Sequence, residues 1–512
     1  QEFWTWLGEG TKLADLFLQV RINGDVALFK GLSREVLAAE EQRPGTVVDR
    51  AFIEQHTTGF DEFKSALQQV QFDEIVEQSG ISKSQIQEAA QIFIESERVI
   101  ICWAMGLTQH KNGVANVQEI VNLMMLRGQL GKPGAGFCPV RGHSNVQGDR
   151  TMGIWDQPSD EFLDKLGAEF NFEPPRRHGY DTVHAIQAMH DGKAKVFFAL
   201  GGNFLSATPD TEYTADALRR CRLTVHVSTK LNRAHLITGK QALILPCLGR
   251  TEIDEQAGGP QLVTTENSMA VVEAWQGKLA PASDHLLSEP AIVASLAKAV
   301  FGEKTTVDWD RLNANYDLIR DSIERVVPGF ANYNERVRQP GGFYLPNPIR
   351  DREFNTKDGR AHFTVHPLPA INLGPEEFLM MTMRSHDQFN TTIYGLDDRY
   401  RGIRNGRRVV FLNADDIKAH GFETGARVDL ISRYDGQERI ASSFTIVPYS
   451  IPRRCAATYF PEANVLVPVT YFADKSHTPA SKSVVITIQP ANELTTNELT
   501  TEDTEKKKTM KG

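Results

Sequence analysis

The sequence predicts an α/β fold, with two α/β lobes containing mostly parallel sheets followed by a mostly antiparallel β-barrel domain. In the first half, apolar strand-like runs alternate with helix-like stretches, which is typical of parallel sheets. In the last third, short alternating runs are separated by turn signals such as Asn-Gly and Asp-Gly. The chain has 512 residues, of which 41% are hydrophobic and 24% charged, enough for three or four globular domains.

The first lobe is predicted over residues 1–150. We expect strands at LFLQV (16–20), DVALF (25–29) and VIICW (99–103), because these runs are short and apolar. Helical patterns cover residues 13–50 and 60–70, and a clearly apolar helix is predicted over 114–127. The lobe ends in a glycine-rich stretch at 131–153.

The second lobe is predicted over residues 151–365. Its strands are expected at KVFFAL (195–200), LTVHV (223–227) and ALILP (242–246), with a helix at TADALRR (214–220). In open parallel sheets the ligand lies beyond the carboxyl ends of the strands. We therefore expect three loops to meet at one sheet edge: GGN (201–203), Ser228-Thr229 and the loop after Trp103.

The third domain is predicted over residues 366–490 as a β-barrel. Its strand-like runs are RRVVFLN (407–413), ARVDLISRY (426–434), ASSFTIVP (441–448) and SVVITIQ (483–489). Residues 491–512 contain the repeated NELTT and a polar, charged ending without core-forming periodicity. We expect this tail to be disordered.

The composition argues against several classes of protein. The chain carries 56 basic and 65 acidic residues, a net charge of -9, whereas binding to a nucleic-acid backbone needs a basic face. No apolar run approaches the roughly 18 residues of a membrane span, so no transmembrane helix is predicted. We therefore expect no nucleic-acid partner and no membrane span.

The five cysteines are scattered without a CxxC pair, so they predict no metal cluster by themselves. Cys102 and Cys247 lie at the ends of apolar runs and are expected to be buried, inert thiols in a reduced, cytoplasmic protein. The chain begins with Gln1 and lacks the charged and apolar segments of a signal peptide. It has the character of a fragment whose beginning is missing.

The stretch GKPGAGFCPVRGHSNVQGDRTMG (131–153) is expected to be a ligand-holding loop, since glycines permit close backbone approach and Arg141, Asn145 and Gln147 supply donors. It is not a Walker A loop, because Pro133 follows Lys132 where Ser or Thr is needed. It is not a dinucleotide fingerprint either, because Gly134-Ala-Gly136 is followed by Phe-Cys-Pro. This loop serves another kind of ligand.

Four segments, taken in order, resemble one family. They are residues 10–32, the run GLTQHKNG to DRTMG (106–153), LGGN with ILPCLGRTEIDEQAGG (200–203 and 244–259), and MRSHDQFNTTIYG with PEANVL and HTPASK (383–395, 461–466 and 477–482). Together they resemble the bis-molybdopterin-guanine-dinucleotide oxidoreductases, which include formate dehydrogenase, nitrate reductase and dimethyl sulfoxide reductase. The nearest subgroup is the YdeP-like alpha (molybdopterin) subunits, and the resemblance covers about residues 8–490.

The resemblance implies a Mo-bis-molybdopterin guanine dinucleotide cofactor, with a [4Fe-4S] cluster in a missing amino-terminal part and an electron-transfer partner. Such a cofactor needs close-approach glycines and polar donors for its phosphates and guanines. No protein ligand to the metal is assigned. The cofactor candidates that match the family's motifs are Gln19, Gly24, Asp25, Gly106, Gly201, Gly202, Asn203, Thr229, Arg384, Ser385, Gln388, Asn390, Asn464 and Lys482.

The resemblance also implies two-electron redox of a small, anionic substrate. Arg141 lies where formate dehydrogenases keep the arginine that holds the substrate, and a guanidinium suits a carboxylate through its bidentate fork. His143 is the second catalytic candidate, since it could bond a pterin or move a proton, but it stands where formate dehydrogenases have glutamine. Formate itself is thereby in question.

His110 is left unassigned, because a loop histidine is commonly exposed to water, and Glu252 and Asp254 are expected to be structural rather than catalytic. The fragment alone is expected to be inactive. An alternative is a non-catalytic member of the same scaffold that binds cofactor or a partner. A thiamine-diphosphate enzyme also stacks α/β lobes, but its acidic magnesium motif is not evident.

Overall fold

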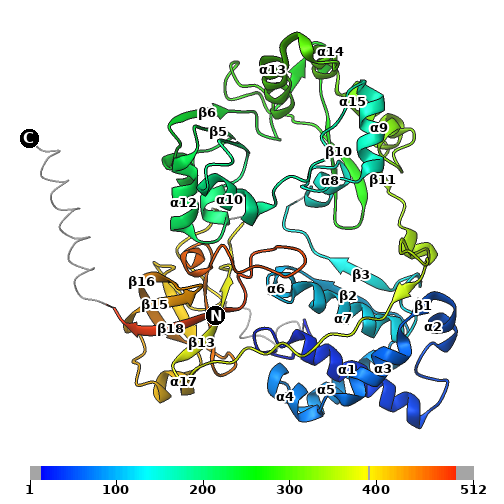
Figure 1. The fold of residues 1–512 in the computed structure, drawn as a ribbon, viewed down its shortest axis with the longest axis vertical. Helices are drawn as coiled ribbons and strands as arrows, with labels where there is room; N and C mark the ends of the chain where they lie inside the picture. Colours follow the sequence, from blue (N-terminus) through cyan, green and yellow to red (C-terminus); the bar gives the residue numbers. More distant parts are fainter. Residues whose placement is uncertain (1–12, 144, 390–392, 492–512) are drawn as a thin grey trace, which may run out of the picture.

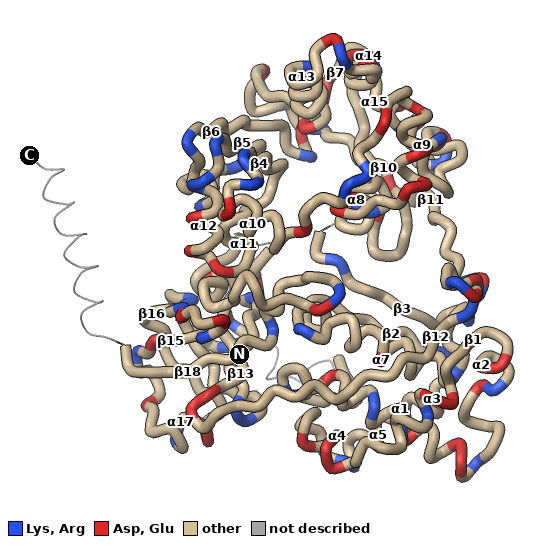
Figure 2. Tube along the Cα trace, in the orientation of Figure 1, with Lys and Arg blue, Asp and Glu red and all other residues tan. Residues whose placement is uncertain are grey.

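The computed structural model describes residues 13–143, 145–389 and 393–491, and it has the predicted α/β character with a closed carboxyl-terminal barrel (Figure 1). The predicted disordered tail lies outside the described residues. Along the described trace, Lys and Arg are interspersed with Asp and Glu (Figure 2). No helix in the described ranges combines the length and apolar character that a membrane crossing needs.

The amino-terminal lobe is a helical layer beside a small parallel sheet. Its buried apolar side chains come mainly from the helices and from Ala361 and Phe363. Strand β2 pairs in parallel with β3, and β1 pairs in parallel with β12, so the chain returns to this lobe just before the barrel. The helices are α1 (Asp25–Gln42), α2 (Arg50–His56), α3 (Phe60–Gln69), α4 (Phe72–Ser79), α5 (Lys83–Glu95), α6 (Met105–Thr108) and α7 (Gly113–Leu126), and the strands are β1 (Thr57–Thr58), β2 (Ile100–Trp103), β3 (Gly136–Pro139) and β12 (Ala361–His362).

Two strands expected in this lobe are absent at their predicted positions. LFLQV (16–20) has no regular secondary structure, and DVALF (25–29) forms the first turns of helix α1. The buried positions Val26, Lys30, Ser33 and Leu37 recur three or four residues apart along α1, which is helical spacing. A five-residue apolar window could not reveal that period.

The second α/β region contains a three-stranded parallel sheet in the order β4-β5-β6. All three strands, β4 (Val196–Leu200), β5 (Leu223–Ser228) and β6 (Gln241–Pro246), lie where the apolar runs predicted them. Helices α10 (Thr182–His190) and α12 (Thr211–Arg220) pack with each other beside this sheet, and short helices α11 (Phe204–Ala207) and η2 (Arg233–Leu236) follow β4 and β5. The expectation that the loop after Trp103 shares this sheet's edge is wrong, because β2 belongs to the separate β2-β3 sheet.

A mixed region, drawn at the top of Figure 1, joins residues from before and after the β4-β5-β6 sheet around one apolar core. Its antiparallel sheet has the order β11-β10-β9. Helices α8 (Val146–Thr151), α9 (Asp160–Phe170), α13 (Glu289–Phe301), α14 (Trp309–Ala314), α15 (Tyr316–Val326), α16 (Tyr333–Arg336), η3 (Gly302–Lys304) and η4 (Pro348–Asp351) accompany strands β7 (Glu255–Gln256), β8 (Gly259–Pro260), β9 (Val263–Glu266), β10 (Val271–Trp275) and β11 (Phe343–Tyr344).

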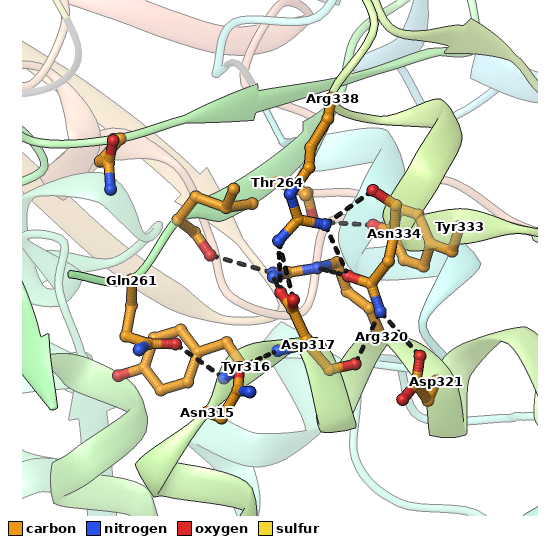
Figure 3. A network of polar contacts seen from close by, with 12 residues as sticks. Gln261, Thr264, Asn315, Tyr316, Asp317, Arg320, Asp321, Tyr333, Asn334 and Arg338 are labelled. Atoms are coloured by element: carbon orange, nitrogen blue, oxygen red, sulfur yellow. Dashed lines mark hydrogen bonds and ion pairs between the residues drawn. The ribbon is translucent and has the colours of Figure 1, made fainter. Parts of the chain in front are cut away.

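Buried Arg320 on α15 ties this mixed region together (Figure 3). Its guanidinium donates to the Asn334 side chain at 2.6 Å and to the Leu262 carbonyl at 3.0 Å, and it pairs with Asp317. Asp317 also accepts from Arg338 at 2.7 Å, and Asn334 donates to Asp321 at 2.7 Å (Figure 3). The network links α15 to α16 and to the chain before β9.

The carboxyl-terminal barrel closes in the order β13-β17-β14-β16-β15-β18. Four of its six strand pairings are antiparallel and two are parallel, in agreement with the predicted mostly antiparallel barrel. Strands β13 and β17 lie outside the predicted runs, since both are buried almost continuously and lack an alternating pattern. The elements are β13 (Glu377–Met383), β14 (Val409–Leu412), α17 (Ala414–Ala419), β15 (Arg427–Tyr434), β16 (Gln437–Pro448), β17 (Cys455–Tyr459), η5 (Asn464–Leu466) and β18 (Val484–Pro490).

The two cysteines predicted to be buried differ in the structure. Cys247 is buried, but Cys102 is exposed. Cys102 lies on β2 two residues after Ile100, which is also exposed, and alternate residues of a strand share a face, so this face of β2 is open to solvent. Cys138 lies opposite Cys102 in that pairing.

Candidate functional site

The barrel holds together loops that follow strands in two different regions. The backbone N–H groups of Asp474 and Lys482 donate to the carbonyls of Lys111 and Gln109, which follow β2, at 2.9 and 3.0 Å. The Asn464 side chain donates to the carbonyls of Ser206 and Thr208, which follow β4, at 2.7 and 3.2 Å. The loop after β2 and the loop after β4 therefore both contact the barrel, although they follow strands of two different sheets.

Lys482 and Arg384 bring two positive charges together at this junction. Lys482 Nζ donates to the Thr382 carbonyl, and burial together with nearby Arg384 lowers the pKa of Lys482 to about 8. Arg384 lies 5.9 Å from the Phe460 ring, and burial lowers its pKa as well. No carboxylate of the described residues forms an ion pair with either cation, so the pair is suited to an anionic ligand.

His110 lies beside this pair and is buried, contrary to the expected exposure to water. Its Nε2 lies 2.7 Å from the Gly106 carbonyl, in α6, and its Nδ1 has no partner among the described residues. Burial, reinforced by the charge of Lys482, lowers the pKa of His110 to about 4. The imidazole is therefore neutral near pH 7. A Cβ built on Gly106 would meet nothing within 4 Å, so that backbone has open space beside it.

Gly201, Gly202 and Asn203 follow β4. Both glycines have positive φ, at 72° and 76°, and the nearest atom to a Cβ on either is Glu289 Oε1, 4.0 Å from that of Gly201. Asn203 is 5% exposed, yet neither polar atom of its side chain has a partner among the described residues. Because an unpartnered buried amide is costly, this side chain is suited to a ligand hydrogen bond. Thr229, after β5, is exposed.

The amino-terminal candidates have contacts of their own, separate from those of Lys482 and Arg384. Gln19 donates to the Ser450 carbonyl at 2.7 Å. A Cβ on Gly24 would lie 2.8 Å from the Gln78 carbonyl oxygen, so chain packing alone explains that glycine. Asp25 stands in the first turn of α1, and burial raises the pKa of its carboxyl to about 6.

Ser385 and Gln388 are bound by Arg407, a buried residue that the sequence analysis missed. Arg407 donates to the Ser385 hydroxyl at 2.6 Å, to the Gln388 side-chain oxygen at 2.9 Å and to Glu462 at 2.8 Å. These contacts hold the segment that follows β13 against the Phe460 carbonyl, which accepts hydrogen bonds from Arg407 and from Gln388 at 2.8 Å each. Asn390 lies outside the described residues. The Asn464 amide, expected to face ligand, is occupied by the two carbonyls described above.

The glycine-rich loop carries Arg141 and His143 on the surface. Both side chains are exposed, and Arg141 is fixed through its backbone N–H, which donates to the Ser268 hydroxyl at 3.1 Å. The following helix α8 is anchored by buried Glu266, whose carboxylate accepts from Gln147 at 2.8 Å and from Thr151 at 2.6 Å. The loop is therefore held at its base while Arg141 and His143 project from it.

Glu252 and Asp254 have the structural contacts expected of them. Glu252 accepts from the backbone N–H groups of Gly249 and Ala282 at 2.6 and 2.7 Å. Asp254 accepts from the Tyr316 hydroxyl at 2.6 Å, and burial with this contact raises the tyrosine pKa. Both acids fasten loops of the mixed region.

Comparisons with known proteins agree with this architecture. Residues 14–237 match the molybdopterin oxidoreductase family and residues 378–508 match the molybdopterin dinucleotide-binding domain. An uncharacterized oxidoreductase of Mycobacterium tuberculosis is 53% identical over 490 residues, covering 94% of this chain and 63% of the relative. Protein YdeP of Escherichia coli K12 is 44% identical over 496 residues, covering 94% of this chain and 65% of the relative. The chain thus spans somewhat less than two thirds of these relatives' length.

The solved structure of acetylene hydratase from Pelobacter acetylenicus shares the fold. The match has a TM-score of 0.63 at 16% sequence identity, and it covers 94% of this chain and 72% of the hydratase chain. The two family models lie on the amino-terminal regions and on the barrel that meet at the cations described above. On these matches, the chain belongs to the bis-molybdopterin-guanine-dinucleotide oxidoreductase superfamily.

Proposed function

We propose that this chain binds the dinucleotide arms of a Mo-bis-molybdopterin guanine dinucleotide and that the whole protein oxidises or reduces a small anionic substrate by two electrons. The observation that carries the proposal is the Lys482–Arg384 pair, because two adjacent cations without a carboxylate partner in the described chain call for a polyanion. A pyrophosphate is such an anion.

The residues present fit this cofactor in other respects. Gly201 and Gly202 leave the backbone after β4 open to close approach, and Asn203 offers a buried donor and a buried acceptor. The guanine edge presents both donors and acceptors, which an asparagine amide can match. We assign the phosphates to Lys482 and Arg384 and a polar contact to Asn203. The bound molybdenum would supply the two-electron redox chemistry.

For the substrate, we propose that Arg141 holds a carboxylate or a similar planar anion. Its guanidinium is exposed, while the helix after the loop is anchored through Glu266. An anchored loop limits the entropy lost when the guanidinium orders around an anion. His143, two residues further along, is proposed to exchange a proton with substrate or solvent. Electron exchange with a [4Fe-4S] cluster or a separate electron-transfer partner is proposed on the family resemblance.

The test is Arg141→Gln in protein that has been shown to carry molybdenum and pterin. Formate and nitrate serve as probe substrates, each with a viologen dye. We expect the variant to keep its molybdenum content and to lose about a hundredfold in kcat/KM, because a charge-assisted bidentate contact is removed. Arg150→Gln, which changes an exposed arginine on α8, is the matched control.

Three outcomes would contradict parts of the proposal. An Arg141→Gln variant as active as the parent would show that Arg141 does not bind the substrate. Absence of molybdenum and pterin from protein matured in a competent host would contradict the proposed oxidoreductase function. Stoichiometric cofactor without turnover of any small oxo-substrate would favour the alternative of a non-catalytic scaffold.

A further inference from the structure

Three metal-ligating side chains outside the proposed cofactor site converge where α10 meets the barrel. Asp181, His184 and His477 place their ligand atoms within 4.8 Å of one another. Asp181 Oδ2 lies 2.7 Å from His184 Nδ1 and 2.8 Å from His477 Nδ1. Two imidazole nitrogens and one carboxylate oxygen therefore lie close together.

The carboxylate and the first imidazole are fixed by the start of α10. Asp181 is the N-cap residue of this helix, and its Oδ1 accepts from the His184 backbone N–H at 3.0 Å. One carboxylate oxygen thus serves the helix, while Oδ2 is directed to the two imidazoles. The spacing of three residues places His184 over the cap residue on the same side of the helix.

The second imidazole comes from the barrel domain. The His477 backbone N–H donates to the Ala473 carbonyl at 3.0 Å, and the Ala473 N–H donates to the Thr478 carbonyl at 2.8 Å, so a tight turn presents this residue. The rings of His184 and His477 lie 5.0 Å apart, and both contact Phe472, at 5.7 and 5.2 Å between centroids. Phe472 packing restrains both imidazoles before any ion binds.

This ligand set has the chemistry of a zinc-class ion. Imidazole nitrogen and carboxylate oxygen bind Zn²⁺ at roughly 2.0–2.2 Å, which in tetrahedral geometry separates ligand atoms by about 3.3 Å. The two Asp181–imidazole separations of 2.7 and 2.8 Å need to widen by about half an ångström, and the two imidazole ligand atoms, which lie within 4.8 Å of each other, need to stand about 3.3 Å apart. Rotation of the two exposed imidazole side chains can supply both adjustments. The side chains of His184 and His477 are 40% and 37% exposed and that of Asp181 18%, so an ion can enter and a water can complete its coordination.

We propose that Asp181, His184 and His477 form a site for a divalent zinc-class ion that clamps α10 to the barrel. The site uses none of the residues assigned to the molybdenum cofactor, so metal binding here can be tested independently of the proposed function. Without the ion, the same residues form a hydrogen-bonded His–Asp–His bridge. The bound ion would replace that bridge by coordinate bonds between the two domains.

The experiment titrates the purified protein with Zn²⁺ against a chromophoric chelator, and with Co²⁺ followed by its visible absorption. We expect one ion per chain and Co²⁺ bands of a four- or five-coordinate site. Removal of both imidazoles in His184→Ala/His477→Ala should weaken binding at least about a hundredfold, since even residues that only support metal ligands contribute about ten- to a hundredfold. His190→Ala changes another histidine of α10 that lies outside the trio and should leave the affinity unchanged.

A second measurement guards against misfolding of the double variant. His477→Gln changes only the turn residue of the barrel, and it should fold with parent-like circular dichroism but lose the rise in unfolding temperature that Zn²⁺ gives the parent. Failure of the parent to bind Zn²⁺ or Co²⁺ at micromolar concentration would overturn the proposal. So would equal binding by the parent and by the double variant.

Discussion

Replacing Lys482 by Met should stabilise the cofactor-free protein while removing a cofactor contact. Burial, with the neighbouring Arg384, lowers the pKa of Lys482 from 10.5 to about 8, a fall of about 2.5. At about 1.36 kcal/mol for each pKa unit, holding this charge in the fold costs about 3 kcal/mol at pH 7. The variant also loses the hydrogen bond to the Thr382 carbonyl, worth about 1 to 2 kcal/mol for a charged donor. The net expectation is a gain of about 2 kcal/mol.

The assay is urea unfolding of protein produced in a host that cannot make molybdopterin. Lys111→Met, which changes an exposed lysine on the loop that contacts the barrel, is the control and should leave the free energy of unfolding within about 0.5 kcal/mol of the parent. The pH dependence supplies a second check. The unfolded lysine holds its proton up to about pH 10.5 and the folded one only to about pH 8. The free energy of unfolding of the parent should therefore rise with pH between these two values.

A Lys482→Met protein that is less stable than the parent at pH 7 would contradict this prediction. So would the same pH dependence of stability in the parent and the variant between pH 8 and 10.5. Either result would mean that the ammonium is satisfied within the fold and needs no ligand anion.

Three other predictions concern stability and loop order. Arg320→Ala should cost about 3 kcal/mol, because loss of the buried guanidinium leaves the Leu262 carbonyl without its donor, removes one of the two donors to the Asn334 side-chain oxygen and leaves Asp317 without its buried partner. Arg338→Ala at a half-exposed position should cost under about 1 kcal/mol, and urea unfolding at pH 7 compares the two variants. Folded His110 has a pKa of about 4 and the unfolded side chain 6.5, so stability should fall by about 2 kcal/mol from pH 7 to pH 5 on account of this residue, and His110→Gln should remove that slope in paired unfolding curves. Glu266→Ala should speed hydrogen exchange of the α8 amides at least about tenfold, because two hydrogen bonds to a buried carboxylate are lost; unchanged exchange would show that the loop is held elsewhere.

The sequence predicted best those elements whose own residues determine them. Strands β4 and β6 coincide with apolar runs that end at glycine or proline, and β5 coincides with the largely apolar run LTVHV. Their parallel pairing follows from the helical connections between them. The first turns of α1 were mistaken for a strand because the helical period appears only over the full 18-residue helix. Strands β13 and β17 have no alternation to reveal them, since both of their faces are covered.

The site was predictable in part, through motif positions rather than through geometry. Lys482, Arg384 and Asn203 matched a family pattern. Within the described part of the chain, however, the two cations have no carboxylate partner and the Asn203 amide has no hydrogen-bond partner, and both facts are properties of the packed fold. The burial of His110 depends on the barrel segment that carries Lys482, some 370 residues further along the chain. Arg407 carried no motif at all, and its role arises because β13 and the turn after β17 meet around it.

The role of Lys482 and Asn203 in holding the dinucleotide cofactor is tested by the molybdenum and guanine-nucleotide content of the purified protein and of a Lys482→Met/Asn203→Ala variant. We expect protein matured in a competent host to carry one molybdenum and two guanine nucleotides, and the variant to fold but to lose most of both. Parent protein without either component, or a variant that retains the full content, would contradict the assignment of these residues to the dinucleotide cofactor.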